Sequence, residues 1–359
     1  MNKIYTFLIL ILIVGTFHGL CDFDARIAKW YDNHAAAISL TYDDGYPVSK
    51  LNRRVNRFMI ENGMCLEYEL VTRTYRRSPF LKKFLLEKMI PSGLGYFGHG
   101  DTHVNHDQLT YEEALASFAR CNKTMKEFGL KTVAYAYPHG KGREAETKKA
   151  LAEAGFLSGR LHFSRRMTNP YIIPGSKTEP DDWFGLPTVV MRDYSFDQCE
   201  RCVSNNEQLI PYLDNTLGKT AWIILTYHAI GNEKGYGFFK FDEFQKNIFS
   251  IKERDFWNAS MNAVTLYIRE RAVAKVKMEV GARKKKKIKK INVTLSDGLP
   301  NDLYDQPLTI LFKLPASWVK RQVALVENGK TVKTMTFEST NAKISLKPDE
   351  IERKLVLKK

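Results

Sequence analysis

Two short polar motifs carry the residues that could do chemistry in this sequence. The first, Thr41-Tyr42-Asp43-Asp44-Gly45, places two carboxylates side by side, and the second, His99-Gly100-Asp101-Thr102-His103, places two imidazoles four residues apart. Histidines at this spacing share one face if the segment is helical, so both can bind one ion. One Asp and two His ligands leave a coordination position open, as in catalytic zinc sites. The other Asp is then available to handle protons.

Buried strands are expected to position these motifs. Residues 35–42 form an apolar run that predicts a buried strand, and Gly45 ends it directly after the carboxylates. A second apolar run, residues 223–227, is followed by His228. Because successive side chains point to opposite faces of a strand, two neighbouring Asp residues at a strand end can take different roles.

Amphipathic segments alternate with the predicted strands. Apolar residues recur at helical spacing in residues 53–62, 111–128, 143–154 and 241–253. A capping sequence, Thr110 to Glu113, begins one of these helices, and residues 256–261 and 265–271 are typical of a final strand and helix. This alternation favours a parallel sheet covered by helices, either closed as a barrel or doubly wound.

The two motifs resemble those of the polysaccharide deacetylases, the NodB-homology group of carbohydrate esterase family 4. The family's first motif is T-F/Y-D-D-G and its second is H-x-x-x-H. The resemblance implies that Asp43 is the catalytic base and that Asp44, His99 and His103 bind the metal. It also implies an α/β fold, a distorted (β/α) barrel with its active site at the carboxyl ends of the strands.

A third motif of the family is similar to the segment around Pro138. The resemblance implies that Tyr137 and Pro138 line the substrate groove and that the backbone N–H of His139 binds the oxyanion. The Arg that the family usually has here falls on Ala136, so it is absent. Arg160 could supply the missing guanidinium, or it could be an ordinary surface cation.

His228 resembles the histidine of the family's fifth motif, L-x-H, which acts as general acid. The ordinary pKa of histidine, near 6.5, suits it to protonate a leaving amine. Leu225 precedes it and could form part of a pocket for the acetyl methyl group, or simply core. Trp183 belongs to the single Asp-Trp dipeptide of the chain, which either corresponds to the family's fourth motif or lies in a loop.

The resemblance therefore implies a metal-dependent deacetylase acting on acetylated polysaccharide. Zn²⁺ suits the ligand set, and Co²⁺ or Ni²⁺ could replace it. Both N-acetylated, GlcNAc-type glycans and O-acetylated ones such as acetylxylan stay open as substrates. A catalytically impaired, glycan-binding relative of the same fold is the alternative that the missing Arg suggests. The presence of Asp43 and of all three metal residues favours the enzyme.

Composition predicts three parts of the chain. In residues 1–21, Lys3 precedes a fourteen-residue apolar run, which is typical of a signal peptide and short for a membrane span. We therefore expect a secreted, periplasmic or cell-envelope protein without a transmembrane span in its mature form. A lipid anchor on Cys21 is not expected, because no small residue directly precedes it. Residues 22–280 are expected to form the deacetylase domain.

Residues 281–359 are predicted to form a small, basic β-sandwich-like domain. Residues 283–359 hold 18 basic and 8 acidic residues, about +10 of the chain's overall +15. Asn328-Gly329 lies between two alternating runs and predicts a β-hairpin. The positive charge could dock an anionic cell-wall glycan, or lysines could keep strand edges from pairing with other chains. Nucleic acid is not an expected partner, because the chain has no recognised binding motif.

Overall fold

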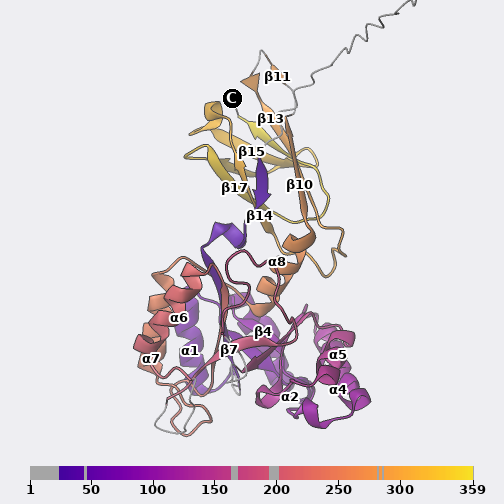
Figure 1. The fold of residues 1–359 in the computed structure, drawn as a ribbon, viewed down its shortest axis with the longest axis vertical. Coiled ribbons are helices and arrows are strands. Elements are labelled where there is room, and N and C mark those ends of the chain that lie inside the picture. Colours follow the sequence, from indigo (N-terminus) through magenta and orange to yellow (C-terminus); the bar gives the residue numbers. More distant parts are fainter. Residues whose placement is uncertain are drawn as a thin grey trace, which may run out of the picture.

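A computed structural model describes residues 24–43, 47–162, 169–193, 202–280, 283–284 and 287–358. The chain forms two lobes stacked along its long axis, a barrel with helices and a β-sandwich (Figure 1). The predicted signal peptide and Asp44 lie outside the described residues. Within those residues, no helix combines the length and hydrophobicity that crossing a membrane requires.

Seven parallel strands form the barrel. They are β2 (Ala36–Tyr42), β3 (Glu67–Leu70), β4 (Gly95–Gly98), β5 (Ala134–Ala136), β6 (Ser158–His162), β7 (Leu186–Met191) and β8 (Trp222–Tyr227). The ring closes because β2 pairs with β8 on one side and with β3 on the other. A short strand, β9 (Phe256–Asn258), pairs with the start of β2. The predicted (β/α) barrel is thus confirmed, and the closing pair excludes the doubly wound alternative.

Helices surround the barrel. They are α1 (Lys50–Glu61), α2 (Thr72–Arg77), α3 (Pro79–Phe84), α4 (Tyr111–Glu127), α5 (Ala145–Glu153), α6 (Asn206–Gly218), α7 (Phe241–Lys252) and α8 (Met261–Val273). The capping box predicted at Thr110 and Glu113 is present at the start of α4. The last helix begins at Met261, earlier than predicted, because the Ser260 side chain caps it by accepting the Ala263 N–H.

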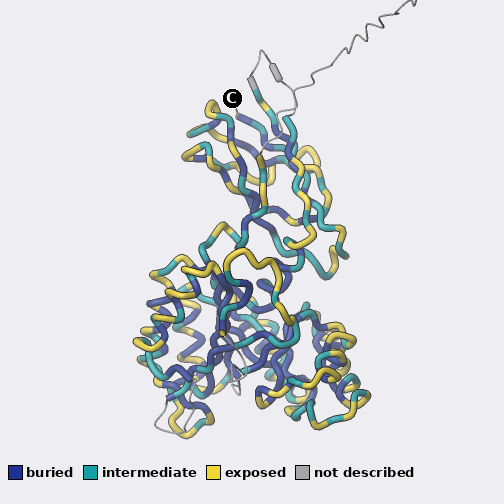
Figure 2. Tube along the Cα trace, viewed as in Figure 1, coloured by how far each residue is buried: buried dark blue, intermediate teal, exposed yellow. Residues whose placement is uncertain are grey.

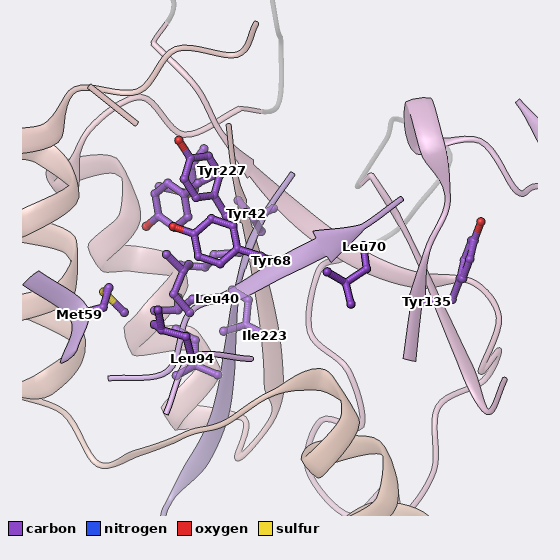
Figure 3. Close-up of a cluster of buried hydrophobic side chains, with 14 of the residues drawn as sticks. Leu40, Tyr42, Met59, Tyr68, Leu70, Leu94, Tyr135, Ile223 and Tyr227 are labelled. Carbon is purple, nitrogen blue, oxygen red and sulfur yellow. The ribbon is translucent and has the colours of Figure 1, made fainter. Parts of the chain in front are cut away.

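Alternation along the strands separates an outer apolar layer from a polar interior. Leu40, Tyr42, Ile223 and Tyr227 point outward and pack with Met59 of α1 (Figure 3). Inside the barrel, the hydroxyls of Thr41 and Thr188 both hydrogen-bond that of Thr226, at 2.9 and 2.7 Å. The side chains two residues further along these strands therefore point towards the barrel mouth.

Two antiparallel sheets form the sandwich. The first contains β1 (Ala25–Ile27), β14 (Leu308–Lys313) and β17 (Asn341–Leu346); the second contains β10 (Lys275–Val280), β13 (Lys290–Ser296), β18 (Arg353–Leu357), β15 (Gln322–Glu327) and β16 (Lys330–Thr336). A two-stranded ribbon, β11 (Arg283–Lys284) and β12 (Lys287–Ile288), accompanies them. The predicted all-β fold of this region is confirmed. The hairpin predicted at Asn328-Gly329 joins β15 to β16, with both residues at positive φ.

The sandwich shares one core with the barrel. Trp222 and Ala37, at the amino ends of their strands, belong to the same buried cluster as Tyr267 of α8 and Ile310 of β14. Buried residues therefore continue from the barrel through α8 into the sandwich (Figure 2). The first sheet also includes β1, which precedes the barrel in sequence. The sandwich thus packs on the amino end of the barrel, away from the strand ends that carry the polar motifs.

Candidate active site

A polar pocket lies at the carboxyl ends of the barrel strands. Its lining consists of Asp43, His99, His103, His139, Gly140, His162, His228 and Tyr236. Five of the chain's eight histidines therefore line one pocket. Asp43, His99 and His228 each directly follow a barrel strand, and His162 ends another. A barrel brings the carboxyl ends of its strands together, which explains how distant motifs meet here.

The base predicted from the first motif, Asp43, is buried against a guanidinium. Arg160 donates a hydrogen bond from Nη2 to Asp43 Oδ1, and both side chains are almost fully buried. Arg160 is the register partner of Ala136 on the adjacent strand. Burial alone would raise the pKa of the Asp43 carboxyl, but Arg160, with His99 and His228, holds that pKa well below its usual range. The carboxylate is therefore ionised at neutral pH.

The two histidines of the second motif come together without a helix. Residues 99–105 form an irregular loop after β4, so the two histidines do not share a helical face. The rings of His99 and His103 nevertheless lie 5.0 Å apart between centroids. The loop is held by Asp101, which pairs with Arg76 at 2.8 Å and accepts a hydrogen bond from Thr72 at 2.9 Å.

His99 is oriented by hydrogen bonding through its Nδ1. Nδ1 lies 2.9 Å from the carbonyl oxygen of Ala136, which can only accept, so Nδ1 carries the proton. Nε2 faces Glu69, with 3.0 Å between Nε2 and Glu69 Oε2. Burial lowers the pKa of His99 to about 3. A neutral imidazole with its Nδ1–H bound to a backbone carbonyl is the usual arrangement of a metal-binding histidine.

His228 and His162 lie on the opposite side of the pocket, beside Asp43. Their ring centroids are 6.1 Å apart, and one ligand atom from each lies within 4.8 Å of a carboxylate oxygen of Asp43. Burial, Arg160 and His228 lower the pKa of His162 to about 3. The exposed ring of Tyr236 lies edge-on to His228, with centroids 5.3 Å apart.

A strained turn follows β5 at the pocket. His139 has a φ of 58° within the turn Pro138–Gly140, and its ring lies 4.4 Å from that of His103. Non-glycine residues at positive φ are uncommon and gather at functional sites. A Cβ at Gly140, whose φ is 61°, would come within 2.7 Å of the His162 ring, so the close approach requires glycine here.

Four of the five residues predicted to contact substrate lie away from this pocket. Leu225 faces the outer helices as part of the main core. Tyr137 is buried and donates to the carbonyl of Phe184 at 3.2 Å, and Pro138 is buried beside it. Trp183 stacks beneath Arg269, 4.2 Å from the guanidinium carbon to the ring centroid. The fifth, Arg160, lies under the pocket against Asp43.

Two groups of described residues could hold a metal ion, each with one carboxylate and two histidines. One is Glu69, His99 and His103; the other is Asp43, His162 and His228. The first contains both histidines of the predicted metal triad, whose third member, Asp44, lies outside the described residues. Carboxylate and imidazole donors suit a divalent transition metal. In the second group the Arg160 guanidinium already neutralises the carboxylate, so the first group fits a cation better.

Sequence reasoning missed three residues around the pocket: Glu69, His162 and Tyr236. Glu69 and His162 each lie within one residue of the carboxyl end of their strand. Each also follows a buried charged residue by two positions, Glu67 and Arg160. The burial of these two residues follows from the closed barrel, so the sequence alone did not point to Glu69 or His162. Tyr236 sits in a loop, and nothing in the sequence pattern points to it.

Comparison with known proteins finds similarity in the barrel. The family model described as polysaccharide deacetylase matches residues 31–158. The chain is similar in structure to a Mycobacterium smegmatis protein assigned to the polysaccharide deacetylases, with 16% identity and a TM-score of 0.50 over 72% of this chain and 98% of that one. This likeness shows the fold.

Weaker structural likenesses fall in the same group. One is to a family 4 carbohydrate esterase from Streptomyces lividans, with 11% identity and a TM-score of 0.41 over 64% of this chain and 93% of that one. Another is to a family 4 pseudoenzyme from Bacillus anthracis, with 13% identity and a TM-score of 0.41 over 64% and 65% of the two chains. No curated protein matches the chain in sequence. The predicted resemblance to the polysaccharide deacetylases is confirmed.

Proposed function

Since residues 31–158 match the polysaccharide deacetylase family and the barrel has the fold of such proteins, we propose that this protein is a metal-dependent deacetylase. It hydrolyses acetyl groups on N-acetylated, GlcNAc-type or O-acetylated polysaccharide. The observation that carries the proposal is the contact of Arg160 with Asp43 in a pocket lined by five histidines. This contact provides the positive charge that is missing at position 136. The missing charge was the reason to consider a catalytically impaired relative.

Asp43 is proposed as the general base. Its carboxylate is ionised at neutral pH, and Arg160 engages Oδ1, which leaves Oδ2 to take a proton from an attacking water. A base needs only to be within hydrogen-bond reach of that water when substrate is bound. His228, buried beside Asp43, is proposed as the general acid that protonates the departing sugar amine or alcohol. The backbone N–H of His139 is proposed to stabilise the oxyanion.

His99 and His103, with Asp44, are proposed to hold the metal, for which Zn²⁺ is the first choice and Co²⁺ or Ni²⁺ are alternatives. When bound, a divalent cation would supply polarisation of the acetyl carbonyl and of the attacking water. The bond from His99 Nδ1 to the Ala136 carbonyl fixes the ring so that Nε2 faces the site. Ala136 therefore still serves the site through its backbone.

Tyr236 is proposed as a contact for the sugar ring. It is 61% exposed and lies at the pocket rim beside His228. An exposed aromatic face beside a polar pocket suits the apolar face of a pyranose, while the phenol stays in water. This placement would set the sugar that bears the acetyl group across the mouth of the barrel.

The protein is proposed to act outside the cytoplasm, on wall or extracellular glycan, as its basic N-terminal leader indicates. The sandwich lies at the amino end of the barrel, so a role in docking anionic glycan would hold that polymer away from the pocket. The exposed edge strand β16 carries Lys330 and Lys333. We propose two roles for this positive charge: docking of anionic glycan and protection of the sheet edge from pairing with other chains.

Acetate release tests the proposed activity. The metal-reconstituted protein would be incubated with chitin oligomers, peptidoglycan and acetylated xylan, each beside a chelator-treated sample. Release that the chelator suppresses supports the deacetylase, and the responding substrate separates N- from O-deacetylation. If the metal-loaded protein releases no acetate from any of these glycans, the result would favour the glycan-binding relative.

A further inference from the structure

Glu69 faces the metal-binding edge of His99. It lies on β3, next to the last residue of that strand, and is 9% exposed. Its Oε2 is 3.0 Å from His99 Nε2, and ligand atoms of Glu69, His99 and His103 all lie within 4.8 Å of one another. Glu69 lies between the two sequence motifs and belongs to neither of them.

The tautomer of His99 makes this contact informative. Nδ1 gives its hydrogen to the Ala136 carbonyl, so Nε2 of the neutral ring holds a lone pair. Glu69 Oε2 lies 3.0 Å from this Nε2, and a ligand atom of His103 lies within 4.8 Å of both. This spacing suits three ligand atoms around one cation. A divalent cation bound to both atoms, and to His103, satisfies all three side chains.

We infer that Glu69 is a metal ligand in this protein, completing a carboxylate–histidine–histidine set with His99 and His103. The inference rests on the metal-dependent function proposed above and adds to it a carboxylate ligand from β3.

Glu67 provides a matched control on the same strand. It points to the same side of β3, is fully buried, and accepts the Met261 N–H at 2.7 Å through Oε1. Burial raises the pKa of the Glu67 carboxyl well above its usual range, so Gln replaces a neutral side chain of nearly the same shape. Glu67→Gln and Glu69→Gln thus make the same chemical change on one strand, two residues apart.

The test measures metal affinity directly. Full-length protein, freed of metal, would be titrated with Zn²⁺ and with Co²⁺ against a chromophoric chelator, and the visible spectrum of the Co²⁺ form would be recorded. Glu69→Gln should weaken binding at least about tenfold and change the Co²⁺ spectrum, since even groups outside the ligand shell cost 10- to 100-fold on removal. Glu67→Gln should match the unmodified protein. If Glu69→Gln does not fold, Glu69→Asp, which withdraws the carboxylate by one methylene, carries the same test.

Equal metal affinity and an unchanged Co²⁺ spectrum in Glu69→Gln would overturn the inference and leave Glu69 only as a neighbour of His99 Nε2. If chelator-sensitive acetate release then persists, the proposed function stands without it. Conversely, metal binding that depends on Glu69 in a protein that releases no acetate from any glycan supports the inference and contradicts the proposed function.

Discussion

Arg160 reaches Asp43 from the strand next to the one on which the family pattern places an arginine. Arg160 on β6 is the register partner of Ala136 on β5, and both point into the barrel. Because neighbouring parallel strands lie less than 5 Å apart, moving a long side chain one strand over can keep its head group at the same carboxylate. Arg160 thus places a positive charge beside Asp43 from β6, where Ala136 on β5 carries none.

Removing the Arg160 charge should change the pH dependence of turnover. In Arg160→Met the volume is nearly kept, but Asp43 loses the cation that lowers its pKa. The acid limb of kcat/KM should move to higher pH by about 1–3 units. Breaking a buried pair also costs about 3–5 kcal/mol of stability, so the unfolding free energy must be measured alongside. An unchanged pH profile in folded, metal-loaded protein would show that Arg160 does not tune the base.

The register relationship predicts a rescue. Ala136→Arg combined with Arg160→Ala returns the guanidinium to the position expected from the family, beside the same carboxylate. The double variant should recover a substantial part of the activity that Arg160→Ala loses. The new arginine at position 136 can extend into the space that Arg160→Ala leaves on the neighbouring strand β6. The comparison is the kcat/KM of the two variants under identical metal loading. No recovery in a folded double variant would indicate that the geometry of Arg160, and not only its charge, is required.

Stability should fall as the solution becomes acidic, partly because of His106. This side chain is 1% exposed and stacks on Phe118, with centroids 4.2 Å apart. Burial lowers its pKa to about 4, so the unfolded chain binds one more proton between about pH 4 and 6.5. Stability then rises with pH across this window and is lost as pH falls through it. In metal-free His106→Gln, the slope of unfolding free energy against pH should be smaller by up to about 1.4 kcal/mol per unit. Equal slopes in the two proteins would contradict this.

Deleting residues 283–359 should destabilise the barrel. The deletion removes β14, which pairs with β1, and uncovers the buried face of α8 around Tyr267. The truncated protein should unfold at lower denaturant concentration, or fail to accumulate as folded material. Unaltered stability would show that the shared core contributes little.

A charge reversal separates docking from this structural role. Lys330→Glu with Lys333→Glu changes the exposed edge strand β16 without touching the core. If the sandwich docks anionic glycan, this variant should sediment less with insoluble wall material, while its acetate release from soluble oligomers stays the same. If the variant and the unmodified protein sediment equally at low ionic strength, the result would favour the hypothesis that these lysines protect the sheet edge.

Local patterns predicted the parallel sheet covered by helices, and the resemblance to the family decided for a barrel. The buried strands that precede Asp43 and His228 follow from apolar runs, and the hairpin at Asn328-Gly329 follows from turn chemistry. The pairing of β1 with β14 could not be predicted, since nothing local in three residues marks their partner.

The remaining misses have a similar cause. His162 lines the pocket and Glu69 lies against His99 because of strand alternation and register, which depend on how the barrel closes. Of the two alternatives for Leu225, acetyl pocket or core, the structure shows core. Leu225 points away from His228 because residues three apart on a strand face opposite sides.

The most direct test of the central claim is turnover by metal-loaded Asp43→Asn. The substitution keeps the size of the side chain and removes only its ability to take a proton. The variant should still bind one equivalent of metal, and its chelator-sensitive acetate release should fall at least about 100-fold below that of the unmodified protein. Release at the unmodified rate would contradict the assignment of Asp43 as the base.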